Sequence, residues 1–443
     1  MRGSGGGASQ HWHIAAFGAV LALLAPARGL PEPSDEPLRL SFPEAMRRAF
    51  TRNPDALIAS EEIARARAIV EQVRAGSLPT ATATTAYTQL NTARLTTSAP
   101  PSVILPRIGF NASGTLALPL DPRRWVQWSQ ARENVKVARL SARDVRRQLA
   151  VTVGQVYLSV AVQRKLVQAD ENAVQNAAAH VEYTRTRLDA GNGTLVDFQR
   201  ASALYYSDRA DLERTRFLLV RLQEQLGVLL GESAPVDAVM EVELPGVPGD
   251  MKTALEDADR LRSDLRLARE RLSVAEKVYR ESWADFMPSA SASFELIYQT
   301  PPTQSLPTES WQLMLNVGFP VYDGGLRFGL VRERRALEGE AGIQLDATLR
   351  QVRSEVRTAL AELERARAAV GLAREAARLS SEVLHLTTVS YRSGLSNDIQ
   401  VIDAQLASRN AEISAALAEN DARQAQLDLL IATGHFPPAE LAP

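Results

Sequence analysis

Two stretches of the chain, each about 70 residues long, are almost free of proline, the residue that most strongly interrupts helices. From Asp121 to Ala190 there is no proline after Pro122, and the only glycine is Gly154. The second stretch runs from Gly325 to Ser393 and contains no proline. At 1.5 Å per residue, each would form a helix roughly 100 Å long. A helix of that length exceeds the diameter of a small globular domain, so the sequence predicts an elongated, mainly helical molecule.

Small and apolar residues recur within both stretches at steps of three and four. The first set is Val135, Ala138, Ala142, Val145, Leu149, Thr152 and Val156, and the second is Leu349, Val352, Val356, Ala359, Leu363, Ala366 and Val370. This spacing is typical of coiled-coil seams. Arg, Glu, Gln and Ser crowd the remaining positions, which predicts helices whose outer faces meet water.

The chain also repeats itself internally. Gly191 and Gly231 correspond to Gly394 and Gly434 in the second copy, where the residue numbers are higher by 203. Each glycine pair encloses a helical pattern, predicted at Thr194–Leu230 and Asn397–Thr433. Such a long period indicates a duplicated unit, with a first repeat at 28–240 and a second at 241–443.

Each repeat contains two segments that alternate between apolar and polar residues. They lie at about 79–95 and 107–119 in the first repeat, and at about 288–300 and 309–321 in the second. Trp311, Leu313 and Leu315, for example, alternate with Gln312 and Met314. Alternation at period two predicts strands with two distinct faces, and 9 to 11 residues suffice for a tilted strand to cross a bilayer. An ordinary two-sided sheet packed on helices fits each segment equally well.

The proline-rich connectors Ala99-Pro100-Pro101 and Pro301-Pro302…Pro307 would then be hairpin loops. Four strands are too few to close a membrane barrel, since the smallest have eight, and open edges cannot face lipid. If the strands lie in lipid, several chains must share one barrel. Three chains give twelve strands and a ring of long helices below them.

The N-terminus is typical of an export signal. Ile14–Leu24 is apolar and too short to span a bilayer, and Ala25-Pro26-Ala27 predicts cleavage after Ala27, which makes 1–27 the signal peptide. A disordered tail or a cloning-vector remnant (Met1-Arg2-Gly3-Ser4) is the alternative. The absence of cysteine excludes disulfides and a cysteine nucleophile, and the net charge of −2 gives no basic field for nucleic acid.

Catalysis and metal binding find little support in the sequence. The five histidines are His11, His13, His180, His385 and His435, and none has the spacing of a metal motif. There is no phosphate-binding loop and no nucleophile elbow. We therefore expect neither an enzyme nor a bound cofactor.

Several motifs together resemble the TolC-like outer-membrane efflux protein family. They are Leu40-Ser41-Phe42-Pro43-Glu44-Ala45 with Asn53-Pro54, Pro320-Val321-Tyr322-Asp323-Gly324-Gly325, Tyr391-Arg392-Ser393-Gly394, and Val401-Ile402-Asp403-Ala404-Gln405. The resemblance implies a homotrimer with a twelve-stranded barrel in outer-membrane lipid and a helical barrel in the periplasm. It also implies a passive exit channel that works with a periplasmic adaptor and an inner-membrane pump.

The resemblance further implies residues that hold the periplasmic end shut. Tyr391 and Asp197 match two such positions and are expected to share a hydrogen bond. The position of the family's arginine is Ser396 here, so that charge should be missing. Tyr391 can equally be an ordinary packing residue.

The family's narrowest ring carries two acidic positions per chain. Asp403 matches one of them, and the other is Gln400 in this chain, for which Asp398 could compensate. Three copies of Asp403 would attract cations and deter anions, although a solvated helix carboxylate is the alternative. Gly191 and Gly394 mark two tips suited to adaptor docking, and each also fits a simple helix C-cap.

A soluble periplasmic coiled-coil scaffold or adaptor without a pore is the alternative function. It explains the long helices and the repeat but not four bilayer-length strands at matching places. Within the channel class, drug, metal and protein export remain open.

Overall fold

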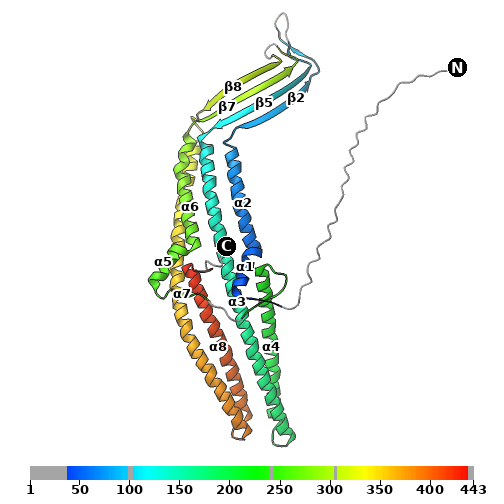
Figure 1. Cartoon of the computed structure of the whole chain (residues 1–443), viewed down its shortest axis with the longest axis vertical. Helices are drawn as coiled ribbons and strands as arrows, with labels where there is room; N and C mark the ends of the chain where they lie inside the picture. The colour runs from blue at the N-terminus through cyan, green and yellow to red at the C-terminus, as the bar shows by residue number, and fades with distance from the viewer. Residues whose placement is uncertain (1–36, 98–102, 240–243, 304–306, 438–443) are drawn as a thin grey trace, which may run out of the picture.

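The computed structural model describes residues 37–97, 103–239, 244–303 and 307–437. The predicted signal peptide and the connector Ala99-Pro100-Pro101 lie outside these residues. The molecule is elongated, with a strand layer at one end and two helical turns at the other (Figure 1). No helix among the described residues is long and apolar enough to cross a membrane.

Two helices run most of the length of the molecule, as predicted. They are α3 (Pro122–Asp189) and α7 (Leu326–Arg392). The Asp121 side chain caps α3 by accepting from the Arg123 N–H, and Pro122 begins the helix, where its missing N–H costs nothing. The shorter partners α4 (Leu195–Leu230) and α8 (Asp398–Thr433) return antiparallel to them and match the predicted ranges closely.

The element order occurs twice along the chain, which agrees with the internal repeat. The first copy is α1 (Phe42–Arg52), α2 (Pro54–Ala75), β2 (Thr80–Gln89), β5 (Ile108–Leu120), α3 and α4. The second is α5 (Met251–Leu261), α6 (Ser263–Arg280) with a short 3₁₀ turn (Glu281–Phe286), β7 (Ser289–Thr300), β8 (Glu309–Gly318), α7 and α8. Helices α2 and α6 accompany the upper parts of α3 and α7 (Figure 1).

The four long strands form one antiparallel sheet in the order β2-β5-β7-β8. Each hairpin pairs the two strands of one repeat, and β5 joins β7 across the repeats. A small ribbon of β3 (Arg94–Leu95) and β4 (Val103–Leu105) extends the first hairpin. Within the described residues, β2 and β8 each have a free edge.

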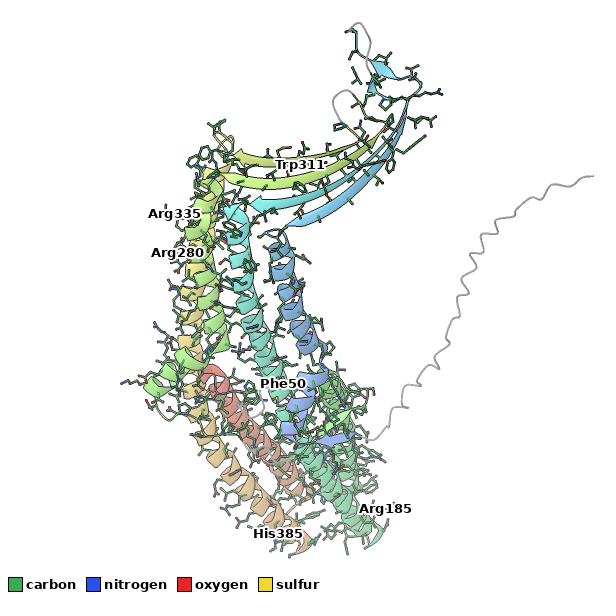
Figure 2. All side chains as sticks on the ribbon, turned by 45° about the horizontal axis from the view of Figure 1, so that its top comes forward. Phe50, Arg185, Arg280, Trp311, Arg335 and His385 are labelled. Atoms are coloured by element: carbon green, nitrogen blue, oxygen red, sulfur yellow. The ribbon has the colours of Figure 1, made fainter. Side chains whose placement is uncertain are left out.

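The register of the sheet separates an apolar face from a polar one. Cross-strand neighbours share a face, and the row Leu116, Phe294 and Leu313 is apolar. Trp311 and Leu313 on this face are 68% and 70% exposed, and Trp311 is labelled on the sheet in Figure 2. The opposite face carries rows of hydroxyl, amide and carboxylate groups, namely Thr84 with Ser113, Glu295 with Gln312, and Ser291 with Asn316.

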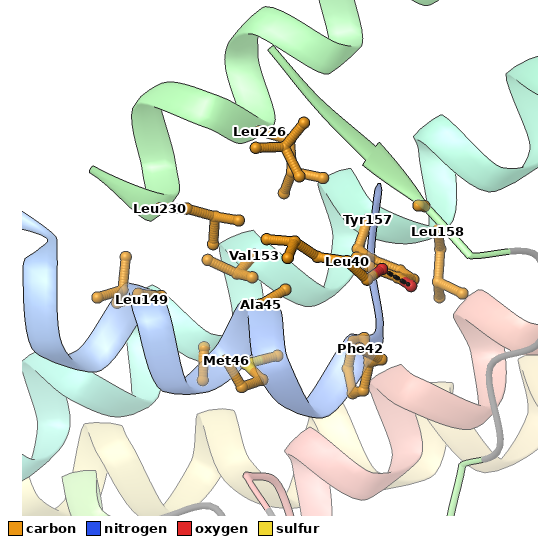
Figure 3. Close-up of a cluster of buried hydrophobic side chains, with 14 of the residues drawn as sticks. Leu40, Phe42, Ala45, Met46, Leu149, Val153, Tyr157, Leu158, Leu226 and Leu230 are labelled. Carbon is orange, nitrogen blue, oxygen red and sulfur yellow. Dashed lines mark hydrogen bonds between the residues drawn. The ribbon is translucent and has the colours of Figure 1, made fainter. Parts of the chain in front are cut away.

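The main apolar core lies near the middle of the rod, around α1 (Figure 1), and its side chains are drawn in Figure 3. There, β1 (Leu38–Leu40) pairs in parallel with β6 (Val236–Ala238), which contacts α3 and α4. The fully buried Tyr157 of α3 donates from Oη to the Leu40 carbonyl at 2.8 Å and accepts from the Val239 N–H at 3.0 Å. The tyrosine thus joins the first strand, a long helix and the segment that links the two repeats.

Candidate functional site

The end of the rod opposite the strands consists of two helical turns. Gly191 closes the turn between α3 and α4, and Gly394 closes the turn between α7 and α8. Their φ angles are 74° and 77°, in the left-handed region that favours glycine. A side chain at either glycine would meet no atom within 4 Å, so both turns present open backbone. The two turns lie at the same end of the molecule (Figure 1).

Polar caps fix the helix that follows each glycine. The Thr194 side chain accepts from the Asp197 N–H at 3.1 Å. At the second turn, Asn397 and Gln400 form a capping box, in which each side chain accepts from the other residue's backbone N–H. Gln400 also accepts from the Ser396 hydroxyl at 2.6 Å. Ser396 and Gln400 therefore serve the turn itself.

Tyr391 is buried beside these turns, in the last turn of α7. Its ring packs on Tyr183 and His180 of α3, with ring centroids 5.5 and 5.6 Å apart. The Arg187 guanidinium lies 5.2 Å from the Tyr391 ring centroid. Burial raises the pKa of Tyr391, the Asp398 charge adds to that shift, and Arg187 opposes it. Two aromatic rings, an imidazole and a guanidinium thus gather between α3 and α7.

The hydrogen bond expected between Asp197 and Tyr391 is not formed among the described residues. Asp197 acts on the tyrosine only through its charge, which also raises the Tyr391 pKa. Ser396 brings no positive charge to this site. Arg187 supplies one from α3, and its guanidinium also donates to the Asn192 carbonyl at 2.9 Å, which ties it to the first turn.

To compensate for Gln400, Asp398 would have to lie beside Asp403 on an exposed surface. It does not. It is 3% exposed, and its Oδ1 lies 2.8 Å from Nε2 of His180. The reason is its place at the first position of α8, which packs inward on α3. Asp403 and Gln400 are both exposed on α8, so the predicted acidic ring rests on Asp403 alone.

Sequence reasoning missed His180 and Arg187. With Thr184 they lie on one face of α3, at steps of four and three residues. This spacing close to Gly191 was the available signal. Within the described part of the chain, no group of three or more metal-binding side chains comes together.

Comparisons with known proteins agree with this architecture. The sequence matches the model of the family described as outer membrane efflux protein over residues 45–232 and 254–435. It is 28% identical to the outer membrane protein OprJ of Pseudomonas aeruginosa over 310 residues, which are 66% of this chain and 63% of OprJ. The match thus spans less than two thirds of the length of that relative.

Two solved structures share the fold. One is a membrane protein from Pseudomonas aeruginosa, with a TM-score of 0.78 and 23% identity over 89% of this chain and 90% of that one. The other is the outer membrane protein VceC from Vibrio cholerae, with a TM-score of 0.76 and 19% identity over 89% and 96%. The matched stretches cover most of both repeats, and the chain belongs to the outer membrane efflux protein family.

Proposed function

We propose that three copies of this chain form a passive exit channel of a tripartite efflux or secretion system. The protein resides in the outer membrane, and its helices extend into the periplasm. In this proposal the strands line a pore through the membrane and the helices continue it as a water-filled tube. An inner-membrane pump would deliver the substrate, which can be a drug, a metal ion or a protein.

The sheet carries this proposal. Its strands are 10 to 13 residues long, which is enough to cross a bilayer when tilted. One face is apolar and exposed, as lipid contact requires, while the other is polar, as a water-filled pore requires. The free edges of β2 and β8 point to pairing between copies, because unpaired backbone groups cannot face lipid.

The helical end supports a role in docking. Leu195 and Leu395, directly beyond the two turns, are 57% and 84% exposed. Apolar side chains at an exposed tip, next to open glycine backbone, suit contact with another protein. We assign this surface to a periplasmic adaptor, with Gly191 and Gly394 at its centre. Asp403 and Gln400 would line the narrowest ring, close to this end.

A soluble periplasmic scaffold is the competing function. The scaffold and the channel differ in whether the protein needs detergent for extraction and in whether it assembles into a trimer. The mature protein should require detergent for extraction, behave as a trimer in detergent, and produce discrete conductance steps in planar bilayers. A protein that stays monomeric and soluble without detergent would overturn the channel proposal. A detergent-dependent trimer that never conducts would overturn the pore while leaving the assembly intact.

A further inference from the structure

Exposed arginine and tryptophan side chains lie on the helices directly below the sheet. Trp125 of α3 is 51% exposed. Four exposed arginines accompany it: Arg132 of α3, Arg280 at the end of α6, and Arg332 and Arg335 of α7. Arg280 and Arg335 are labelled in Figure 2, on the upper parts of their helices. We call these five residues the collar.

The chain itself does not neutralise the collar arginines. Within the described part of the chain, their guanidinium groups form no ion pair and no hydrogen bond. Other arginines near the sheet are paired, by contrast, such as Arg327 with Asp323 and Arg334 with Asp285, each at 2.7 Å. The collar therefore presents positive charge that is free to meet an external anion.

The sheet determines which side of each helix faces away from the pore. Glu295 and the other odd-numbered residues of β7 point to the polar face. One of these residues, Gln299, donates from its N–H to the Thr308 carbonyl, directly before β8, at 2.8 Å. For L-residues this puts β8 to the right of β7 when the polar face is viewed with the helices below. Seen from the pore, the helices then follow from left to right as α2, α3, α6 and α7 (Figure 1 shows them from the opposite side).

The handedness of α7 places its two collar arginines on the outer side. Helix α7 runs away from the sheet, so successive residues turn clockwise by about 100° when seen from the sheet. Arg334 points toward α6, because it pairs with Asp285 in the 3₁₀ turn that follows α6. Arg335 comes one residue later and therefore points away from the pore. Arg332, three residues earlier, is its neighbour on this side.

Helix α3 runs in the same direction and presents its collar residues in the same way. Arg124 donates to the Gly76 carbonyl, directly after α2, and so marks the side of α3 that faces α2. Trp125 is the next residue and points outward. Arg132 lies about two turns further along on the same face, with its guanidinium 5.0 Å from the Trp128 ring centroid.

The collar lies within reach of lipid head groups. Tyr322, between β8 and α7, is 86% exposed, and tyrosine is enriched where membranes meet water. Helix α7 begins at Leu326, so Arg332 and Arg335 lie about 9 and 14 Å along its axis. The head-group layer adds about 5–7 Å to each side of the hydrocarbon core, and long arginine side chains extend toward it. The potential of charged lipids reaches about 8 Å further in physiological salt.

We propose that the collar binds the phosphate head groups of anionic phospholipids in the membrane leaflet that faces the periplasm. The proposal rests on the channel function, because it takes the polar face of the sheet as the lining of the pore. A guanidinium offers paired N–H donors that match phosphate oxygens. An anionic head group also neutralises the arginine charge, whereas a zwitterionic head group brings its own cation. The collar should therefore prefer phosphatidylglycerol to phosphatidylcholine.

Native mass spectrometry of the detergent-solubilised protein can measure this preference. The protein is titrated with phosphatidylglycerol or with phosphatidylcholine of the same acyl chains, and the bound lipid gives an apparent affinity. The test variant is Arg332→Gln/Arg335→Gln. The matched control is Arg350→Gln/Arg353→Gln, since these arginines are exposed on the same face of α7. They lie five helical turns, or about 27 Å, further from the sheet.

We expect the wild type and the control to bind phosphatidylglycerol about tenfold more tightly than phosphatidylcholine, and this preference should weaken in high salt. The test variant should lose most of it. Equal binding of the two lipids by the wild type, or a preference that survives in Arg332→Gln/Arg335→Gln, would overturn the proposal. Inorganic phosphate that abolishes the preference would assign the arginines to a free anion, which also overturns it.

Bilayer conductance separates this proposal from the channel function. We expect the test variant to conduct like the wild type, because its two arginines point away from the pore. A wild type that prefers phosphatidylglycerol but never conducts would count against the pore alone. A wild type that conducts without preferring phosphatidylglycerol would count against the collar alone.

Discussion

At the residue scale, single polar side chains join segments that lie far apart in the chain. Tyr157 binds the Leu40 carbonyl and the Val239 N–H with one hydroxyl, inside an apolar cluster. Its ring also packs edge-on against Phe42, with ring centroids 5.2 Å apart. Because burial disfavours the phenolate, the pKa of Tyr157 is raised. The hydroxyl thus keeps its proton and remains a donor at any physiological pH.

Removing this hydroxyl should destabilise the middle of the rod. Tyr157→Phe removes both bonds of the hydroxyl and leaves the Leu40 carbonyl and the Val239 N–H with only their bond to each other at 3.2 Å, at a cost of about 0.5–1.5 kcal/mol. We expect a lower melting temperature in detergent and unchanged conductance at 25 °C. Tyr206→Phe is the control, because Tyr206 is 65% exposed. Equal melting temperatures for the two variants would show that the buried bonds contribute nothing.

Asp403 should determine which ions pass the closed end. Three carboxylates in one ring raise the local cation concentration, so Asp403→Asn should shift the reversal potential in a salt gradient toward zero. The shift should shrink in high salt, where screening is strong. Glu256→Gln, a change at an exposed carboxylate on α5, should leave the reversal potential unchanged. Selectivity that is identical in wild type and Asp403→Asn would exclude the acidic ring.

At the element scale, the glycines that end the helices fall into two kinds. Gly191 and Gly231 both have positive φ angles, 74° and 67°. A Cβ atom at Gly191 would meet open space, whereas one at Gly231 would lie 2.7 Å from the Arg52 carbonyl oxygen. The first glycine is needed only for its backbone conformation, and the second also lets α4 end against α1.

A pair of alanine variants should separate these two needs. Gly191→Ala should cost about 1–2 kcal/mol from backbone strain alone. Gly231→Ala has the same strain and in addition forces α1 away from α4, so its melting temperature in detergent should fall further. Each variant is the control for the other, since both changes add one methyl group. A greater fall in melting temperature for Gly191→Ala than for Gly231→Ala would contradict the two different roles given to these glycines.

The sequence predicted the long elements well, because proline and glycine mark their ends and their periodicity extends over many residues. The predicted helix Asn397–Thr433 begins at its own N-cap, for example. The parallel pair of β1 and β6 was not predicted, because three-residue strands are too short to show alternation. The partners of His180 and Tyr391 were missed for another reason. They depend on how two distant helices pack, which no local pattern reveals.

At the scale of the whole molecule, the duplication has left two similar joints with different chemistry. In the first repeat, Asn53 lies between α1 and α2 and donates to the Leu229 carbonyl at 2.9 Å. In the second, Arg262 lies between α5 and α6 and donates to the Ala432 carbonyl at 3.3 Å, the residue that corresponds to Leu229 in the repeat. Arg262 also binds Glu355 of α7 at 2.6 Å. The second joint is therefore tied to its long helix by an ion pair that the first joint lacks.

The two free edges of the sheet determine how copies can assemble. Strands β2 and β8 run in opposite directions, because three antiparallel pairings separate them. The β8 edge of one copy can thus continue into the β2 edge of the next as another antiparallel pair, and a closed ring leaves no edge exposed to lipid. Two copies would give eight strands and three would give twelve, so the number of copies determines the number of strands around the pore.

Cysteine cross-linking should count the copies directly. With no native cysteine in the chain, one cysteine placed on β2 and one on β8 can form disulfides only between the engineered positions. A series of pairs that steps along both strands will find the register. Oxidation should then produce cross-linked species of up to three chains and no larger ones, as a closed ring of three requires. If the largest cross-linked species contains two chains, the pore has eight strands. Cross-linked species of more than three chains would mean an open edge. Either result would overturn the twelve-stranded assembly.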